Sequence, residues 1–196
     1  MNHPSDLIDE IVKAQLKPAL KELGFKNKSS TFFRQNGDLV EVVSPQKSSW
    51  NDAGEAKFTI NLGVYWPKVH ETLGRPTASS PPKEYDCTLR QRIGHLFDDG
   101  KDFWWTVKPD SDIRQIGGDV VEKTRTFALP WLARATKLEE AVTMANTGEA
   151  AVFYVMKGDA VAAREVLEKA MAKTKHAKAF LRTLAVKLGL EISQEL

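Results

Sequence analysis

Two arginines are the side chains in this sequence whose type and spacing most favour ligand binding. Arg90 and Arg92 are two residues apart in the segment DCTLRQRI (86–93). The alternation of that segment predicts a β-strand, so both side chains point to the same sheet face. Guanidinium groups bind carboxylates and phosphates through paired hydrogen bonds. Because two like charges on one sheet face need a partner, this pair is the best lead to function.

The other candidate binding residues lie on the elements that we expect around the arginine pair. The segment AKFTINLGVYW (56–66) predicts a central strand with one apolar face, and its other face carries Thr59, Asn61, Gly63 and Tyr65. Arginine, amide and aromatic groups together can hold an anion and stack against a flat ligand. The predicted ligand-binding or partner-binding residues are Gln46, Ser48, Trp50, Asn61, Tyr65, Arg90, Arg92 and Trp104.

A purely structural role competes with this interpretation. Arg90 and Arg92 could pair across the sheet with acids such as Glu41, while the tryptophans fill the core. Aromatic strand residues pack more often than they contact ligands, so we weigh packing ahead for them. Trp104 and Trp105 are adjacent on a predicted strand and should therefore point to opposite faces.

Other chemistry finds little support. The single cysteine, Cys87, could pair with His70 or His95, but its strand position places it on the apolar face beside Leu89 and Ile93. We therefore expect a buried structural cysteine. The sequence has no HExxH, CxxC or Gly-x-Ser-x-Gly motif and no phosphate-binding glycine loop. It predicts no catalytic residue, no metal site and no cofactor.

Composition narrows the class of protein. The 196 residues are 42% hydrophobic and 28% charged, with a net charge of +2, as in an ordinary soluble globular protein. The N-terminus has no signal-peptide pattern, and no apolar run is long enough for a membrane span, so we expect a cytoplasmic protein. A basic C-terminal stripe could dock an acidic partner or nucleic acid, but a solvated helix face is the stronger interpretation; its residues are Lys169, Lys173, Lys175, Lys178, Arg182 and Lys187.

The first half of the chain predicts a helix followed by antiparallel strands. A helix after Ser5 should kink at Pro18 and end at Gly24. A hairpin should follow, with a type I′ turn at Asn36-Gly37. The proline-rich stretch at 74–82 predicts a loop.

The second half predicts two more strands and then helices. Residues 86–93 and 101–107 have strand patterns, and helical periodicity begins at Ser111, interrupted by Gly117-Gly118 and by Pro130. The fold class is therefore α+β, with an antiparallel sheet of about five strands, an N-terminal helix and a C-terminal set of packed helices. We expect a sheet domain over 1–135 and a helical extension over 136–196 packed on it in one compact unit.

Several spaced segments resemble one known family. They are LKPALKELGF (16–25), TFFRQNGDLVEVVSPQKSSW (31–50), FTINLGVY (58–65), CTLRQRIG (87–94) and DFWWTV (102–107). Over roughly residues 7–135 this resembles the bacterial domain-of-unknown-function 4304 family. The resemblance implies a compact α+β domain and supplies no activity, ligand or catalytic residue.

The sequence favours a binding protein over an enzyme. Our leading hypothesis is a non-enzymatic binding domain that uses the polar, arginine-bearing sheet face, with a protein partner favoured and a small-molecule ligand left open. The alternative is a hydrolase or transferase with a pocket around Asn61, Gln46, Arg90 and Arg92. It predicts a concave site that contains groups with perturbed pKa values. Nucleic-acid and membrane binding are disfavoured.

Overall fold

A computed structural model describes residues 3–174 and 176–193. The chain divides into two compact units, each with its own internal packing. The sheet unit comprises Met1–Tyr65 and Ala78–Ala133, and the helical unit comprises Trp66–Thr77 and Arg134–Leu196. The expected packing of residues 136–196 on the sheet domain stays a prediction.

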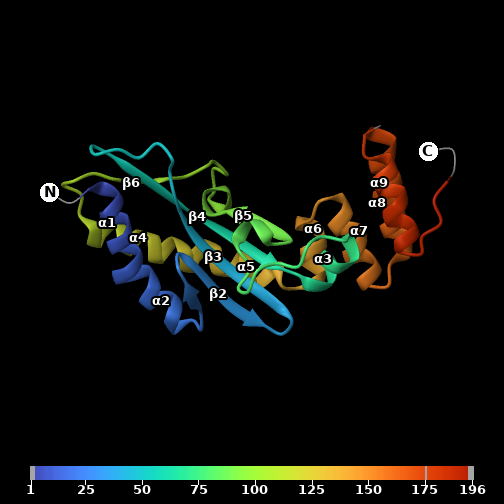
Figure 1. Ribbon diagram of the computed structural model, residues 1–196, viewed down its shortest axis with the longest axis horizontal. Helices are drawn as coiled ribbons and strands as arrows, with labels where there is room; N and C mark the ends of the chain where they lie inside the picture. Colours follow the sequence, from blue (N-terminus) through green and yellow to red (C-terminus); the bar gives the residue numbers. More distant parts are fainter. Residues whose placement is uncertain (1–2, 175, 194–196) are drawn as a thin grey trace. The chain divides into compact units, whose positions relative to one another are not determined.

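The sheet unit is built on one antiparallel sheet, which confirms the predicted fold class (Figure 1). The described strands follow the order β1-β2-β3-β4-β5, and β6 also pairs with β4. Because β5 pairs with Asn61–Val64 and β6 with Ala56–Phe58, these two strands follow one another along the same edge of β4. The strands are β1 (Lys26–Lys28), β2 (Thr31–Asn36), β3 (Leu39–Lys47), β4 (Ala56–Tyr65), β5 (Leu89–Arg92) and β6 (Trp105–Val107).

The two strands after the proline-rich loop are shorter than predicted. Tight 3₁₀ turns at Glu84–Asp86 and Ile93–Leu96 flank β5. Only the last three residues of the predicted strand 101–107 pair with β4. In both segments, backbone pairing with β4 covers only part of the predicted strand, namely 89–92 and 105–107.

The central strand β4 carries the core of the sheet unit on its apolar face. Phe58, Ile60, Leu62 and Val64 are fully buried. Helices α1 (Pro4–Ile11) and α4 (Ile113–Lys123) pack against each other, and α1 packs against β4. The predicted apolar strand face is confirmed.

A π-helical turn precedes the proline in each of the two long helical segments. A π-helical turn at Val12–Leu16 separates α1 from α2 (Lys17–Glu22), which begins just before Pro18. A second π turn at Thr124–Ala128 separates α4 from α5 (Leu129–Ala135), which contains Pro130. Proline lacks an N–H and crowds the preceding turn, so a wider turn accommodates it without ending the helix. Both predicted interruptions are confirmed.

The predicted interruption at Gly117-Gly118 is wrong, because α4 runs through both glycines. A Cβ atom on Gly117 would lie 2.0 Å from the side-chain nitrogen of Gln15. Gln15 donates from that nitrogen to the backbone oxygen of Ile113 at 2.8 Å. Glycine is needed there for the close approach of another helix, and it does not mark a break.

The hairpin between β2 and β3 turns one residue later than predicted. Asn36 pairs with Leu39, so the two central residues are Gly37 and Asp38. Gly37 has φ +58°, whereas neither Asn36 nor Asp38 has a positive φ. A type I′ turn requires positive φ at both central residues, and a type II′ turn places glycine at the first. The turn therefore follows the type II′ pattern. By contrast, Gly24 ends α2 with φ +83°, as predicted.

The helical unit begins with a helix that the sequence patterns did not suggest, α3 (Pro67–Leu73). Trp66 anchors it by donating from Nε1 to the backbone oxygen of Ala135 at 3.1 Å and by packing edge-on against Phe153 at 5.0 Å between ring centroids. The remaining described helices, which confirm the predicted C-terminal helical set, are α6 (Leu138–Met144), α7 (Thr147–Met156), α8 (Ala160–Lys173) and α9 (Lys178–Lys187).

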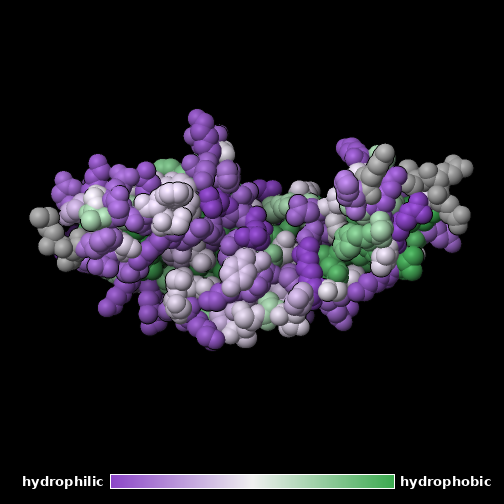
Figure 2. Space-filling model, turned by 45° about the horizontal axis from the view of Figure 1, so that its top comes forward, coloured by the Kyte–Doolittle hydropathy of each residue, from purple (hydrophilic) through white to green (hydrophobic). Residues whose placement is uncertain are grey.

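The two units differ in surface character. Hydrophilic residues dominate the sheet unit in Figure 2, whereas hydrophobic residues gather over the C-terminal helices. Phe180 and Val186 on α9 are 54% and 79% exposed. Within the described ranges, every helix is too short or too polar to cross a membrane.

Candidate functional site

The polar face of the sheet is partly covered by residues 78–88, which run from within the proline-rich stretch to the start of β5 and are called the cover. Val42, Tyr65 and Cys87 form a small buried cluster on this face, with Ala78 packed against it. A Cβ atom on Gly63 would lie 2.5 Å from the sulfur of Cys87, so the absence of a side chain there lets the cover approach the sheet. The face is therefore open only beyond this cluster.

Cys87 is buried, as predicted, but it lies on the other side of the sheet from the expected one. It precedes β5 and packs on Gly63 and Val42, away from the core side of β4. Burial, together with the negative charges of Glu84 and Asp86, raises the pKa of the Cys87 thiol far above its usual range. A thiol in that state is neutral at physiological pH and is a poor nucleophile.

The uncovered part of the polar face holds a cavity of about 570 Å³. It is bounded by β3, β4 and β5 on the sheet side and by the 3₁₀ turn at Glu84–Asp86. Its lining is mainly polar and consists of Ser30, Thr31, Ser44, Pro45, Gln46, Asn61, Lys83, Glu84, Tyr85, Arg90 and Arg92.

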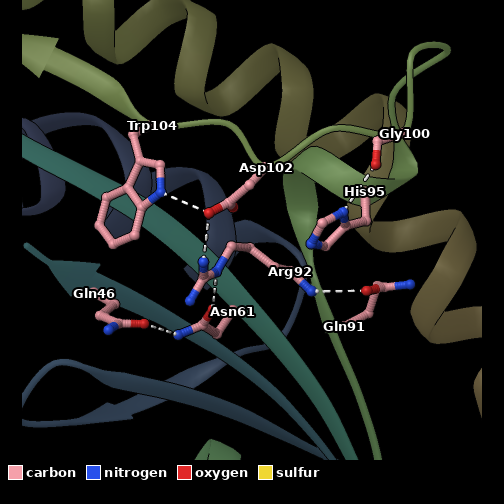
Figure 3. Close-up of polar contacts among 8 residues, drawn as sticks. All are labelled: Gln46, Asn61, Gln91, Arg92, His95, Gly100, Asp102 and Trp104. Atoms are coloured by element: carbon pink, nitrogen blue, oxygen red, sulfur yellow. Dashed lines mark hydrogen bonds and ion pairs between the residues drawn. The ribbon is translucent and has the colours of Figure 1, made fainter.

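Asn61 joins the neighbouring strands at the floor of this cavity (Figure 3). Its Nδ2 donates to Gln46 Oε1 on β3 at 2.6 Å, and its Oδ1 accepts from Arg92 Nε on β5 at 3.2 Å. The nitrogen and the oxygen of the Asn61 side-chain amide each have a partner, which fixes the orientation of the amide. Asn61 thereby helps to position the Arg92 guanidinium, because its Oδ1 accepts from Arg92 while its Nδ2 is held by Gln46.

Arg92 is also held from the far side by a loop. Its Nη1 lies 2.7 Å from Asp102 Oδ2, and the same oxygen accepts from Trp104 Nε1 at 2.9 Å. The guanidinium carbon lies 5.1 Å from the centre of the Trp104 ring, a cation–π distance (Figure 3). Asn61, Asp102 and Trp104 therefore fix Arg92 in one position beside the cavity.

Arg90 is paired with a different acid. Its Nε donates to Glu84 Oε1 at 2.6 Å, and this hydrogen bond raises the pKa of Arg90 above its ordinary value. The suggested pairing of Arg90 and Arg92 with Glu41 is wrong, because Glu41 is buried and pairs with Arg34 at 2.6 Å. Both arginines do have acidic partners, as the structural interpretation required, but these come from flanking segments.

A second cavity adjoins the first along β5. It measures about 210 Å³ and is lined by Asn61, Glu84, Arg90, Gln91, Arg92 and His95. Four of these residues also line the larger cavity, so the two form one continuous polar trough. Nδ1 of His95 lies 2.9 Å from the backbone oxygen of Gly100, which can only accept, so Nδ1 carries the proton (Figure 3).

The charges in the trough favour an anionic ligand. Lys83, Arg90 and Arg92 bring three positive charges to the larger cavity, and Glu84 is the one acid among its described lining residues. Lys83 contacts a neutral partner, the hydroxyl of Thr31, at 3.5 Å. Hydroxyl and amide groups surround these cations and can complete the hydrogen bonding of a carboxylate.

Comparison with known proteins identifies the domain that carries this site. The family described as "Domain of unknown function (DUF4304)" matches residues 16–134, more than half of the chain. The chain belongs to this family. No curated protein and no solved structure gave a match.

The DUF4304 match contains the whole trough. Its lining residues lie between Ser30 and His95, and the two residues that support Arg92 lie at 102 and 104. The match ends within α5, so helices α6 to α9 lie beyond it. The site is therefore a feature of the DUF4304 portion of the chain.

The structure brings together five of the eight residues predicted for the site. Gln46, Asn61, Arg90 and Arg92 line the trough, and Trp104 packs beside Arg92. The other three, Ser48, Trp50 and Tyr65, lie elsewhere, as described next.

Ser48, Trp50 and Tyr65 have structural positions outside the described lining of the trough. Trp50 is 90% exposed on the connection after β3, and its backbone N–H donates to Ser48 Oγ at 3.1 Å. Tyr65 is buried under the cover, and its hydroxyl accepts from the backbone N–H of Ala78 at 3.4 Å. Strand alternation gave the correct face for Tyr65, but it could not show that the chain folds back over it.

Sequence patterns missed the residues that the cover contributes in this DUF4304 domain. Lys83, Glu84 and Tyr85 follow the double proline 81–82, in a stretch with no periodicity. The available signal was their composition, a basic, an acidic and an aromatic residue a few positions before β5. Asp102 lies in an aspartate-rich stretch of the sequence, and only its position in space reveals its contact with Arg92.

Proposed function

We propose that this chain is a binding domain that captures a protein partner through an acidic group seated in the polar trough. The observation that carries the proposal is the gathering of Lys83, Arg90 and Arg92 around a cavity of about 570 Å³. Ligand pockets fall in this range of volume, and cationic, hydrogen-bonding walls select anions. The two arginines are oriented before any ligand arrives, which lowers the entropy lost on binding.

The same contacts explain why carboxylates should be preferred. Arg90 and Arg92 already hold the carboxylates of Glu84 and Asp102 at 2.6 and 2.7 Å. A partner carboxylate can share or replace these contacts without a change in backbone geometry. Such an exchange keeps each guanidinium paired, while Glu84 and Asp102 give up their arginine contacts and so compete with the partner carboxylate.

Affinity capture tests the proposal. Tagged wild-type protein and the Arg90→Ala/Arg92→Ala variant are exposed to lysate of the source organism, and retained proteins are identified by mass spectrometry. Arg125→Ala is the matched control, because Arg125 lies in the sheet unit and is 53% exposed in an ion pair with Glu22. We expect a protein retained by wild type and control, lost from the double variant and displaced by poly-glutamate.

The opposite result is equally clear. Equal retention of the partner by a well-folded double variant would exclude the trough as the binding site. Displacement by nucleic acid in place of poly-glutamate would assign the trough to a different ligand class.

A hydrolase or transferase acting around Asn61, Gln46, Arg90 and Arg92 is the alternative function. The concave site that it requires is favoured by the trough itself. However, the pKa of Arg90 is raised, so that this residue acts as a fixed cation and does not exchange protons near neutral pH. Turnover of a p-nitrophenyl ester or phosphate that is lost in the Arg90→Ala/Arg92→Ala variant would favour the enzyme.

A further inference from the structure

The proposed function leaves open how an acidic partner lies in the trough, and the geometry of β5 points to one binding mode. Resting on that proposed function, we propose that an acidic protein segment binds as an extended strand along the outer edge of β5. Its alternate carboxylates then reach Arg90 and Arg92.

β5 is an edge strand. Among the described strands it pairs with β4 alone, and β6 occupies a separate stretch of β4. An edge strand leaves one row of backbone N–H and C=O groups without strand partners, and an added strand can take them up. The smaller cavity of about 210 Å³ is lined by three successive residues of this strand, Arg90, Gln91 and Arg92.

The hydrogen bonds of β5 show which backbone groups are on that edge. The N–H of Arg92 donates to the side-chain oxygen of its neighbour Gln91 at 3.1 Å (Figure 3). In a regular antiparallel pair, alternate residues point their backbone groups the same way, so we infer the same outward direction for the N–H of Arg90 within β5. A side chain from the same strand thus occupies the place that an added strand would take.

Side-chain spacing supplies the specificity. Arg90 and Arg92 lie two positions apart on one face, about 7 Å along the strand. Acidic residues at alternate positions of an extended segment have the same spacing. Glu84 and Asp102 already place one carboxylate on each arginine, which shows that both can hold a carboxylate in this arrangement.

Charge decides the kind of occupant. A second copy of β5 would bring arginines against arginines, and charged residues on an edge strand discourage such pairing. An acidic segment meets the same edge with opposite charge, and Lys83 extends the positive surface into the larger cavity. The occupant is therefore an acidic segment of another protein.

Peptide binding to the full chain tests this inference by fluorescence anisotropy at low ionic strength. One labelled peptide contains Glu-Val-Glu, and a second of identical composition contains Glu-Glu-Val, with the same flanking residues. A third is the first peptide N-methylated at alternate amides, which removes strand hydrogen bonds and leaves its charge unchanged. We expect the first peptide to bind about tenfold more tightly than either of the others.

Protein variants and hydrogen exchange complete the test. Arg90→Ala/Arg92→Ala should lose binding of the first peptide, whereas Arg125→Ala, the ion-paired control, should retain it. The amide protons of Arg90 and Arg92 should exchange more slowly when that peptide is bound. Equal affinity for all three peptides, or unchanged exchange at both amides, would overturn strand addition.

The outcomes separate this inference from the proposed function. Binding of all three peptides that still requires the arginines would leave the acidic-partner function standing without strand addition. Capture of an arginine-dependent partner from lysate, with no binding of the Glu-Val-Glu peptide, would likewise support the acidic-partner function and exclude strand addition. If neither a peptide nor a lysate protein binds in an arginine-dependent way, both strand addition and the proposed acidic-partner function are overturned.

Discussion

Arg92 is the most tightly positioned side chain of the trough. An amide, a carboxylate and an aromatic ring contact it from three directions, namely Asn61, Asp102 and Trp104. Arg90, by contrast, is 51% exposed and is held by Glu84. The two arginines therefore differ in the number of side chains that hold them, and Glu84 is the internal group that competes with an external acid for Arg90.

Replacing Glu84 tests this competition. Glu84→Gln removes a negative charge but keeps the size of the side chain, so Arg90 becomes available to a ligand carboxylate. We expect the affinity for an acidic peptide to rise up to about fivefold, as for one surface charge pair. Isothermal titration of the variant against wild type measures the change. Weaker binding by the variant would show that Glu84 contacts the ligand and does not compete with it.

Cys87 supplies a pH-dependent prediction. Its pKa in the folded protein is raised far above the ordinary value of a thiol because burial disfavours the thiolate. The unfolded chain therefore loses this proton first, and folding stability is lost as the pH rises through the unfolded pKa. Above about pH 9, the free energy of unfolding of wild type should fall by up to about 1.4 kcal/mol per pH unit more than that of Cys87→Ala. Urea denaturation at several pH values measures both, and parallel curves would contradict burial of the thiol.

At the residue scale, alternation along strands predicted what lies on a face but not what covers it. Asn61, Arg90 and Arg92 were found because their spacing is local. Tyr65 was placed in the site because its parity is correct, yet contacts made by residues 78–88 bury it. Lys83 and Glu84 were missed for the same reason, since a loop that folds back leaves no periodic signal.

At the scale of elements, β4 connects the core to the site. Its apolar face packs under the helices, while Asn61 on its other face contacts both neighbouring strands. A change on the core side should therefore alter stability, and a change at Asn61 should mainly alter the position of Arg92. This separation makes the two faces independently testable.

Substitution of Ile60 or Leu62 by alanine tests the buried face. Both side chains are fully buried, so each change should cost about 2–5 kcal/mol of unfolding free energy through lost burial and cavity formation. Lys57→Ala on the same strand is the control, with an expected effect within about 0.5 kcal/mol because its side chain is 49% exposed. Denaturation midpoints that shift equally in all three variants would show that the strand faces are misassigned.

Gly63→Ala tests the contact between the cover and the sheet. The new Cβ would meet the sulfur and Cβ of Cys87 at 2.5 and 2.7 Å. Because this space is filled, we expect a loss of about 1–3 kcal/mol in urea denaturation. Gly118→Ala is the control, since nothing lies within 4 Å of its added Cβ. Equal stability of Gly63→Ala and wild type would contradict the close packing of the cover.

Element boundaries were predictable where one residue sets the geometry. Gly24 and the two prolines marked helix changes correctly, because positive φ and a missing N–H act locally. The hairpin was misplaced by one residue, since Asn-Gly and Gly-Asp allow different turns and strand register selects between them. α3 was overlooked although Pro67 and Gly74 bracket it in the typical N-terminal and C-terminal positions.

At the scale of the whole molecule, the trough and the basic C-terminal helices are separate candidates for binding an acidic partner. The trough lies in the DUF4304 portion, and the described basic residues of α8 and α9 lie beyond it. Of the predicted basic stripe, Lys175 lies outside the described residues. Sequence composition alone could not rank these two surfaces, because it does not show which cations surround a cavity.

A titration of the ¹⁵N-labelled 196-residue chain with poly-glutamate, followed by NMR, tests the central claim most directly. The indole N–H signals of Trp104, beside Arg92, and of Trp50, which is 90% exposed on another part of the sheet unit, are internal reporters. We predict large shifts for the Trp104 indole and for the amides of Asn61, Arg90 and Arg92, with Trp50 unchanged and all shifts lost in Arg90→Ala/Arg92→Ala. Shifts confined to α8 and α9, with Trp104 unmoved, would contradict the account.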